Sequence, residues 1–242
     1  MSSSSTLKIK LFADGADLSG IKEMAADPTI KGFTTNPTLM RKAGVVDYKA
    51  FALQVVDLVG GRPVSFEVFA DEFDEMERQA LEIASWGNNV SVKIPVTTTK
   101  GEFCGPLIER LSAAGVQLNV TAVMTLDQVK RITEKLSSAT PAIVSVFAGR
   151  IADTGRDPVP VMAEAVRILR DRPKAELIWA SPRELLNVFQ ADSVGCQIIT
   201  ATNDILKKLS LVGKNLDDYS LETVEMFHKD AKTAGYNIAT RR

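Results

Sequence analysis

The sequence contains a single histidine, His228, which lies near the C-terminus in the helix-like stretch SLETVEMFHKDAK. A Ser-His-Asp or Cys-His triad would have to use that residue, and a metal site built from several histidines is impossible. We interpret His228 as an ordinary helix residue. Carboxylates, lysine or tyrosine must therefore supply any acid–base chemistry.

Cysteine is also scarce, and long apolar runs are missing. Cys104 and Cys196 lie far apart without the spacing of metal ligands, which is typical of reduced, partly buried thiols in a cytosolic protein. No apolar run approaches the ~20 residues of a membrane span. The first residues, MSSSSTLKIK, lack the apolar core of a signal peptide. We expect a cytoplasmic protein with a flexible polar tail over residues 1–7 and no membrane contact.

Neither sign of charge dominates the chain, whose formal net charge is −1 and whose pI is near 6.0. This balance argues against a nucleic-acid or membrane surface, and it leaves room for a local anion site. The 242 residues are 45% hydrophobic, as in an ordinary globular protein that buries a large core. Because the sequence contains no repeat, low-complexity block or interdomain linker, we expect residues 1–242 to form a single domain.

Short runs of β-branched and aromatic residues alternate with helix-like segments along the chain. Eight alternating β and α units predict an α/β fold, a single closed (β/α)8 TIM barrel. An open doubly wound sheet is the competing arrangement, but no glycine-rich phosphate loop follows any strand. The strand candidates are residues 8–14, 32–36, 63–69, 90–96, 117–124, 142–149, 176–181 and 196–202.

The chain continues beyond what eight such units need. Residues 203–213 provide the eighth helix, and residues 220–233 approximately form an additional C-terminal helix. An apolar stripe on this last helix, made of Leu221, Val224 and Phe227, must cover either the barrel or a neighbouring subunit.

Polar residues gather where the expected strands end, and active sites of such barrels lie at the carboxyl ends of the strands. Taken singly, a polar residue at this place often only caps the next helix. Because all of them point to the same rim, a common functional site is the better interpretation. These residues are Asp14, Thr34, Asn36, Glu67, Lys93, Asn119, Thr121, Ser145, Ser181 and Thr200 or Thr202.

Lys93 is the most unusual of these, since it interrupts the apolar strand VSVKIPV just before Pro95. It could snorkel from an edge strand, or it could form a salt bridge with Asp14 or Glu67 inside the barrel. A further hypothesis is that it is a nucleophile. Partial desolvation in a barrel mouth favours the neutral amine, which attacks carbonyl groups and forms a Schiff base. The iminium lets an adjacent carbon–carbon bond break, and carboxylates such as Asp14 and Glu67 can supply the proton transfers.

Amide and hydroxyl groups complete this expected site. Asn36, Asn119 and Ser145 are suited to hold substrate hydroxyls and developing charge. Such a set fits aldol chemistry on a sugar.

Two arginines add a binding site for an anion. Arg150 follows the sixth expected strand and Arg183 the seventh, where barrels of this kind commonly bind phosphate. Arg183 could instead form a surface pair with the adjacent Glu184. Its spacing from Ser181 and its place at the rim make phosphate binding the preferred interpretation.

Five motifs that span nearly the full chain are similar to those of the transaldolase family in its small form, which is related to fructose 6-phosphate aldolase. They occur in family order, as FTTNPTLM (33–40), VKIPVT (92–97), NVTAVMT (119–125), SVFAGRIADTGRDP (145–158) and WASPRELLNVFQADSVGCQIIT (179–200). The resemblance implies a class I Schiff-base transaldolase of the pentose phosphate pathway. Such an enzyme moves a dihydroxyacetone unit from sedoheptulose 7-phosphate to glyceraldehyde 3-phosphate, giving erythrose 4-phosphate and fructose 6-phosphate. The resemblance further implies no metal or organic cofactor, sugar phosphates as partners, and a ring-shaped homo-oligomer such as a pentamer or decamer.

The same resemblance assigns roles to individual residues. It implies that Lys93 forms the Schiff base and that Asp14 assists proton transfer and carbon–carbon cleavage. Glu67 would be the acid/base acting through a water that Thr121 positions. The implied substrate-binding residues are Thr34, Asn36 and Asn119 for hydroxyls, Ser145 for the dihydroxyacetone end, Phe147 as a pocket wall, and Arg150, Ser181 and Arg183 for phosphate.

The sequence departs from the family pattern at several positions, and this keeps alternatives open. Gly15 and Ala16 follow Asp14 where Thr and Ala or Ser are usual, and Pro182 stands where Phe is frequent. A fructose 6-phosphate aldolase, which releases free dihydroxyacetone, typically carries Gln and Tyr at the positions of Glu67 and Phe147, so this chain favours transaldolase. A transaldolase for another anionic ketose is a further alternative. So is a catalytically silent sugar-phosphate-binding barrel, although the complete catalytic set argues against it.

Overall fold

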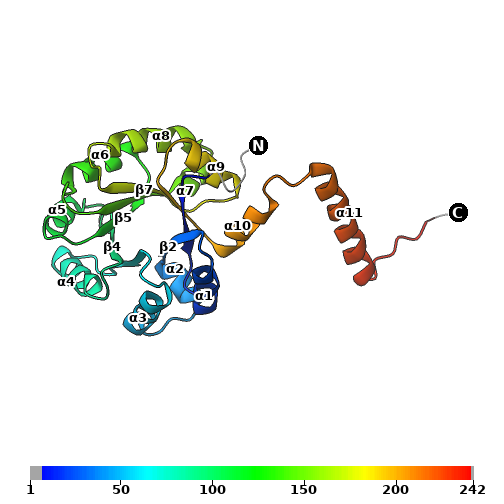
Figure 1. The fold of residues 1–242 in the computed structure, drawn as a ribbon, viewed down its shortest axis with the longest axis horizontal. Helices are drawn as coiled ribbons and strands as arrows, with labels where there is room; N and C mark the ends of the chain where they lie inside the picture. Colours follow the sequence, from blue (N-terminus) through cyan, green and yellow to red (C-terminus); the bar gives the residue numbers. More distant parts are fainter. Residues whose placement is uncertain (1–6, 241–242) are drawn as a thin grey trace.

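The computed structural model describes residues 7–240, in which eight parallel strands form a closed barrel in sequence order (Figure 1). The predicted (β/α)8 barrel with an additional C-terminal helix is therefore confirmed. The predicted polar tail lies outside the described residues except for Leu7, which packs partly buried against the core. The strands are β1 (Lys10–Asp14), β2 (Ile30–Thr34), β3 (Val64–Glu67), β4 (Val90–Pro95), β5 (Leu118–Val123), β6 (Ala142–Val146), β7 (Ala175–Trp179) and β8 (Ile198–Ala201).

Helices surround the barrel, and two of the connections contain two helices each. Both α2 and α3 lie between β2 and β3, and both α7 and α8 lie between β6 and β7. The helices are α1 (Leu18–Ala26), α2 (Pro37–Lys42), α3 (Tyr48–Leu58), α4 (Phe73–Ala84), α5 (Gly105–Ala113), α6 (Leu126–Lys135), α7 (Ala148–Asp153), α8 (Pro158–Leu169), α9 (Leu186–Ser193), α10 (Asn203–Lys207) and α11 (Leu216–Thr233).

Alternation along each strand separates the two faces of the barrel wall. In β4, Val90, Val92 and Ile94 belong to the main apolar core between strands and helices. Side chains successive along a strand point to opposite faces, so Ser91 and Lys93 face the barrel interior. A lysine here is therefore compatible with a fully buried strand, and the edge-strand interpretation of Lys93 is wrong because a closed barrel has no edge.

An apolar layer fills the interior beneath the polar residues. It consists of Phe12, Ile143, Ile178, Ala180 and Ile198, with Phe147 packed against it. The Phe12 ring lies so close to Gly32 that a Cβ there would come within 2.4 Å of it. This layer lies beneath the polar side chains at the carboxyl end of the barrel, where barrels of this class carry their active sites.

The C-terminal segment differs in detail from the prediction. The eighth helix is short, because α10 ends at Lys207 and a 3-10 turn covers Lys208–Leu211. Helix α11 begins at Leu216, about one turn earlier than expected, since the Asn215 side chain accepts from the Asp217 N–H at 2.8 Å and caps it.

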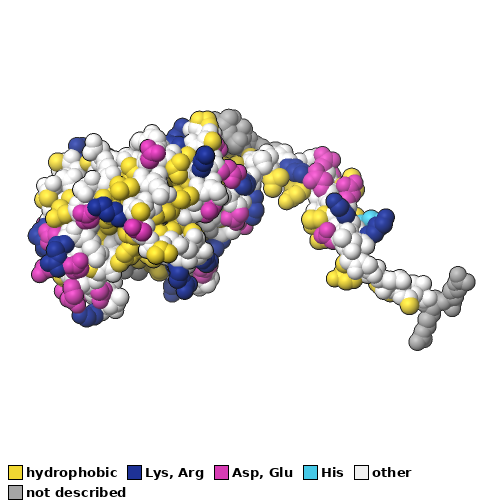
Figure 2. Space-filling view, turned by 90° about the horizontal axis from the view of Figure 1, so that it is seen from below, with side chains coloured by type: hydrophobic (Ala, Val, Ile, Leu, Met, Phe, Trp, Pro, Cys, Tyr) yellow, Lys and Arg dark blue, Asp and Glu magenta, His cyan; other side chains and the backbone are white. Residues whose placement is uncertain are grey.

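Helix α11 stands away from the barrel and contains no buried residue (Figures 1 and 2). Its stripe of Leu221, Val224 and Phe227 is exposed, so this stripe does not cover the barrel. His228 lies exposed on the same helix, far from any catalytic arrangement. Among the described residues, no helix has the length and apolar character that crossing a membrane requires.

A local irregularity of the sheet lies at Ala122 in β5. The pairing of β5 with β6 shifts register between Val120 and Val123, and Ala122 has a φ of 61°. This left-handed conformation costs an L-residue about 1–2 kcal/mol, whereas glycine adopts it freely. The strain follows directly after Thr121, one of the residues singled out in the sequence.

We expect Ala122→Gly to raise the free energy of unfolding by about 0.5–1 kcal/mol, because relief of the left-handed strain exceeds the added backbone entropy of the unfolded chain. Urea unfolding measures this change. Ala175→Gly in β7 is the matched control, since Ala175 is similarly half-buried but has an ordinary φ. The control should lose about 0.5–1 kcal/mol. Equal destabilisation of both variants would show that Ala122 is not strained.

Candidate active site

The carboxyl ends of the strands enclose a cavity of about 390 Å³. Its walls contain all the predicted site residues except Arg183. Thr200, and not Thr202, is the residue that the eighth strand contributes. The lining residues are Asp14, Thr34, Asn36, Pro37, Thr38, Leu39, Glu67, Lys93, Asn119, Thr121, Ala122, Ser145, Phe147, Arg150, Ala180, Ser181 and Thr200.

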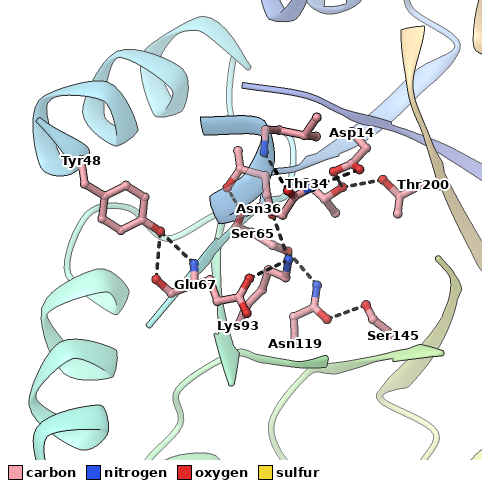
Figure 3. Close-up of polar contacts among 12 residues, drawn as sticks. Asp14, Thr34, Asn36, Tyr48, Ser65, Glu67, Lys93, Asn119, Ser145 and Thr200 are labelled. Atoms are coloured by element: carbon pink, nitrogen blue, oxygen red, sulfur yellow. Dashed lines mark hydrogen bonds and ion pairs between the residues drawn. The ribbon is translucent and has the colours of Figure 1, made fainter. Parts of the chain in front are cut away.

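Lys93 lines this cavity and is only 6% exposed. Its Nζ donates to the Thr35 carbonyl oxygen at 2.8 Å and lies 3.1 Å from Glu67 Oε2 (Figure 3). Glu67 pairs directly with Lys93 across the β3–β4 register, so the two side chains leave neighbouring strands at the same height. The predicted salt bridge inside the barrel is thus formed with Glu67. It is compatible with a nucleophilic role, because a catalytic lysine also needs a partner for its proton.

Asp14 ends β1 on the other side of the cavity and is held by two donors. The Thr34 hydroxyl donates to Asp14 Oδ1 at 2.8 Å, and Asn36 Nδ2 lies 3.4 Å from Asp14 Oδ2. Thr34 also shares a hydrogen bond with Thr200. Because the single Thr34 proton goes to Asp14, Thr200 is the donor in this second bond. The three side chains therefore form a chain of hydrogen bonds that ends on the carboxylate.

The pKa of Asp14 is raised, chiefly because burial disfavours its charged form. The positive charge of Lys93 and the hydrogen bonds from Thr34 and Asn36 act in the opposite direction without cancelling the effect of burial. A carboxyl group of this kind can take up and return a proton nearer to neutral pH than an ordinary aspartate.

Asn119 is fully buried and is oriented from both sides. Its Nδ2 donates to Ser65 Oγ at 3.0 Å, and Ser145 Oγ donates to its Oδ1 at 2.7 Å. These bonds fix which end of the amide faces which neighbour. Ser65 was not predicted, although it precedes Glu67 by two positions and alternation places it on the same inner face.

The amide of Asn36 serves two purposes. Its Oδ1 accepts from the Leu39 N–H at 2.9 Å and caps α2, while its Nδ2 faces Asp14. Asn36 therefore caps α2, as the capping interpretation predicts, and its amide nitrogen also faces the cavity.

The Thr121 hydroxyl is buried and has no hydrogen-bond partner among the described protein groups. Buried polar groups are almost always paired, so an exception in the wall of a cavity marks a group available to a substrate or a water molecule. Thr121 precedes the strained Ala122, and the register shift of β5 sets its position.

The arginine side of the cavity differs from the prediction in one respect. Arg150, on α7, lines the cavity, with its guanidinium 5.8 Å from the centre of the Phe147 ring. Arg183 instead forms an ion pair with Asp153, through Nε to Oδ1 at 2.9 Å, and donates to the Ser181 carbonyl. Glu184, the partner considered from the sequence, is not the one it binds. Phosphate would have to draw the Arg183 guanidinium away from Asp153.

The close packing of α7 against the β7 end depends on Gly149. A Cβ at this position would lie 1.6 Å from the Ser181 carbonyl oxygen. Ser181 itself has a φ of 56°. Within residues 7–240, the non-glycine residues with left-handed backbones are Ala122 and Ser181, and both line this cavity. Backbone strain of this kind concentrates at functional sites.

The two cysteines do not compete with Lys93 as nucleophiles. Both thiols are free and buried, more completely than the partial burial expected from the sequence. Burial raises the pKa of Cys104 and of Cys196 to about 12, so neither is a thiolate at neutral pH.

Tyr48 is a site-related residue that the strand-end rule did not find, because it lies on α3 and not at a strand end. Its hydroxyl donates to the Glu67 carbonyl at 3.0 Å and accepts from the Glu67 N–H at 2.8 Å. Nothing in the local sequence around Tyr48 signals this contact, which arises only when α3 packs beside β3.

Comparison with known proteins concerns the chain as a whole. Residues 11–239 match the family model described as Transaldolase/Fructose-6-phosphate aldolase. A "Probable transaldolase" of Dehalococcoides mccartyi is 35% identical over 202 residues, which cover 83% of this chain and 90% of that protein. A "Probable transaldolase" of Thermoanaerobacter sp. is 32% identical over 231 residues, covering 95% of this chain and 100% of that protein.

A solved structure extends the comparison to the fold alone. The dihydrodipicolinate synthase of Rhodopseudomonas palustris superposes with a TM-score of 0.61 at 15% identity, over 92% of this chain and 79% of that one. Such a likeness reflects the shared barrel. The family match, by contrast, covers nearly the whole sequence and includes every strand that builds the cavity. The chain therefore belongs to the transaldolase/fructose-6-phosphate aldolase family.

Proposed function

We propose that this protein is a transaldolase that works through a Schiff base on Lys93. The donor is sedoheptulose 7-phosphate and the acceptor glyceraldehyde 3-phosphate, and the products are erythrose 4-phosphate and fructose 6-phosphate. The observation that carries the proposal is the buried Lys93 amine, 3.1 Å from Glu67 and in one cavity with the carboxyl group of Asp14. The probable transaldolases that resemble this chain support the same assignment.

The reaction begins at the Lys93 amine. With its proton given to the Glu67 carboxylate, Nζ attacks the C2 carbonyl of the ketose, and the resulting carbinolamine loses water to give an iminium. Asp14 then accepts the proton of the C4 hydroxyl as the C3–C4 bond breaks. The electron pair of that bond flows into the iminium and leaves an enamine on Lys93, while the shortened aldose departs.

The second half reverses these steps on the acceptor. The enamine carbon attacks the aldehyde carbon of the acceptor, and Asp14 returns its proton to the new hydroxyl. Water then adds to the iminium, with Glu67 and Thr121 placing it, and hydrolysis frees the product ketose and the amine. Asn36, Asn119 and Ser145 hold the hydroxyls of the three-carbon unit, and Thr34 holds Asp14 in place.

The far end of the substrate lies near Arg150. A guanidinium group is suited to bind phosphate oxygens, and Ser181 adds a hydroxyl at the same rim. Arg183 joins them once its pair with Asp153 opens; this pair is about half exposed, and such pairs contribute at most about 1 kcal/mol. Fructose 6-phosphate aldolases typically carry Tyr and Gln where this chain has Phe147 and Glu67. The missing hydroxyl at Phe147 and the carboxylate of Glu67 therefore favour transfer over simple release of dihydroxyacetone.

The proposal is tested by product analysis with fructose 6-phosphate as donor and erythrose 4-phosphate as acceptor. We expect sedoheptulose 7-phosphate to form only when both sugars are present, and Lys93→Met to abolish it. Met keeps the length and most of the volume of the lysine side chain, so loss of activity reports the amine. Steady release of free dihydroxyacetone from fructose 6-phosphate alone would contradict the proposal and assign the chain as an aldolase.

The pH dependence of turnover tests the role of Asp14. Asp14 must be ionised to accept a proton, and its pKa is raised, so kcat should fall on acidification at a higher pH than an ordinary aspartate would give. Thr34→Val removes a hydrogen bond that lowers this pKa, so the acid limb of the profile should move to still higher pH. Thr35→Val is the control, because the Thr35 hydroxyl donates to the main-chain carbonyl oxygen of Ser65 and does not contact Asp14. An acid limb that Thr34→Val leaves in place would contradict the assignment.

We further propose that α11 docks on a second copy of this chain and so builds a homo-oligomer. Its apolar side chains find no partner within the described residues of the subunit, and an exposed stripe of this kind marks an interface. Light scattering should give a mass of at least two subunits of 26.3 kDa each.

Two variants of α11 locate this interface. The double variant Val224→Lys/Phe227→Lys should yield monomers, because it places charges in the stripe. Lys229→Glu changes a charge on the other side of the helix and should keep the assembly. A monomeric wild-type protein would refute the docking of α11.

A further inference from the structure

The hydroxyl of Tyr48, the first residue of α3, binds the main chain of Glu67 twice. It donates to the Glu67 carbonyl oxygen at 3.0 Å and accepts from the Glu67 N–H at 2.8 Å (Figure 3). Glu67 is the last residue of β3, and its carboxylate lies beside Lys93. The Tyr48 hydroxyl thus forms hydrogen bonds with both the N–H and the carbonyl oxygen of Glu67, whose carboxylate faces the Lys93 amine.

These two bonds take the place of a missing rung between β2 and β3. The last ladder bond runs from the Thr35 N–H to the Ser65 carbonyl at 3.3 Å. In a regular parallel ladder the next rung would join the Glu67 N–H to the Thr35 carbonyl, and the N–H of residue 37 to the Glu67 carbonyl. Residue 37 is a proline and has no N–H to donate. The Tyr48 hydroxyl replaces both partners.

Because the Glu67 N–H donates to Tyr48 and not to the Thr35 carbonyl, that carbonyl oxygen is free to accept a hydrogen bond from Lys93. Lys93 Nζ donates to this oxygen at 2.8 Å, and Glu67 Oε2 lies 3.1 Å from the same nitrogen. In a continued ladder the Thr35 carbonyl would point along the sheet toward Glu67. Because β2 and β3 part at this level, it points to the amine instead. The same break between β2 and β3 therefore determines the positions of the Thr35 carbonyl and the Glu67 carboxylate, the two groups that contact Lys93 Nζ.

We propose that Tyr48 is a positioning residue of the active site, whose hydroxyl holds β2 and β3 apart so that the Glu67 carboxylate and the Thr35 carbonyl both face Lys93. The inference rests on the proposed function, since proton transfer between Glu67 and the amine is the step that this arrangement serves. It concerns a residue outside the cavity that acts through the main chain of Glu67 and touches no reacting atom.

The aromatic surroundings of Tyr48 fix the place of its hydroxyl. Its ring lies 4.6 Å from that of Phe69 and 5.5 Å from that of Trp86, centre to centre. Burial raises the pKa of Tyr48 above its ordinary value, so the hydroxyl keeps the proton that it donates. A phenylalanine at this position keeps the ring contacts and loses only the two bonds to Glu67.

The test compares wild type and Tyr48→Phe in the transfer assay and measures hydrogen exchange at the Glu67 amide by NMR in the full-length protein. We expect kcat to fall roughly 10- to 100-fold, because small displacements of catalytic groups are costly, while KM changes less than about twofold. The Glu67 amide should exchange faster. In a Glu67→Gln background, adding Tyr48→Phe should lower kcat clearly less than it does in wild type, because the carboxylate is gone and only the Thr35 carbonyl is left to position.

Tyr236→Phe is the matched control. It makes the same change at a tyrosine that is 80% exposed and has no hydrogen bond to Glu67. We expect the control to keep kcat within about twofold of wild type, since exposed substitutions of this kind have small effects, and to keep the Glu67 amide protected.

Failure of this inference differs from failure of the proposed function. A Tyr48→Phe enzyme with wild-type kcat, or a full additional loss in the Glu67→Gln background, overturns the role of Tyr48. A wild-type protein that forms no sedoheptulose 7-phosphate contradicts the proposed function instead. In that case hydrogen exchange at the Glu67 amide decides: faster exchange in Tyr48→Phe supports the positioning role of Tyr48, and unchanged exchange overturns it.

Discussion

The contact between Lys93 and Glu67 inside the barrel mouth constrains the surrounding structure. The two side chains are 8% and 18% exposed, and their charged atoms lie 3.1 Å apart. Removing such charges from water costs several kcal/mol for each ion, and apolar residues of similar volume are often as stable. The pair is therefore poorly explained as a device for stability. It is well explained if the amine and the carboxylate must exchange a proton out of contact with bulk water.

The rest of the mouth is organised so that nearly every buried polar group has a partner. One chain of hydrogen bonds leads from Thr200 through Thr34 to Asp14. A second set joins Ser65, Asn119 and Ser145. Such networks rigidify a site when all their members are satisfied. The exception is the hydroxyl of Thr121, which is buried without a protein partner and thus remains available to the reaction.

Much of this site could be predicted from the sequence because a closed parallel barrel brings all strand ends to one rim. Alternation within each strand decides which side chains face inward, so Lys93, Glu67 and Asp14 could be grouped without knowledge of any contact. The same reasoning could have included Ser65, which is an inward neighbour of Glu67. It could not find Tyr48, because the contact of a helix side chain with a strand main chain depends on how α3 packs. Nor could it find the pair of Arg183 with Asp153, since Asp153 ends α7, Arg183 lies on the loop after β7, and the two meet only in the folded chain.

Trapping of the Schiff base tests the central claim most directly. Borohydride reduces an iminium to a stable secondary amine, so treatment in the presence of fructose 6-phosphate should fix the three-carbon unit to the protein. Peptide mapping by mass spectrometry should then find this adduct on Lys93 and on no other lysine. An unmodified Lys93 under conditions in which the enzyme turns over would contradict the account.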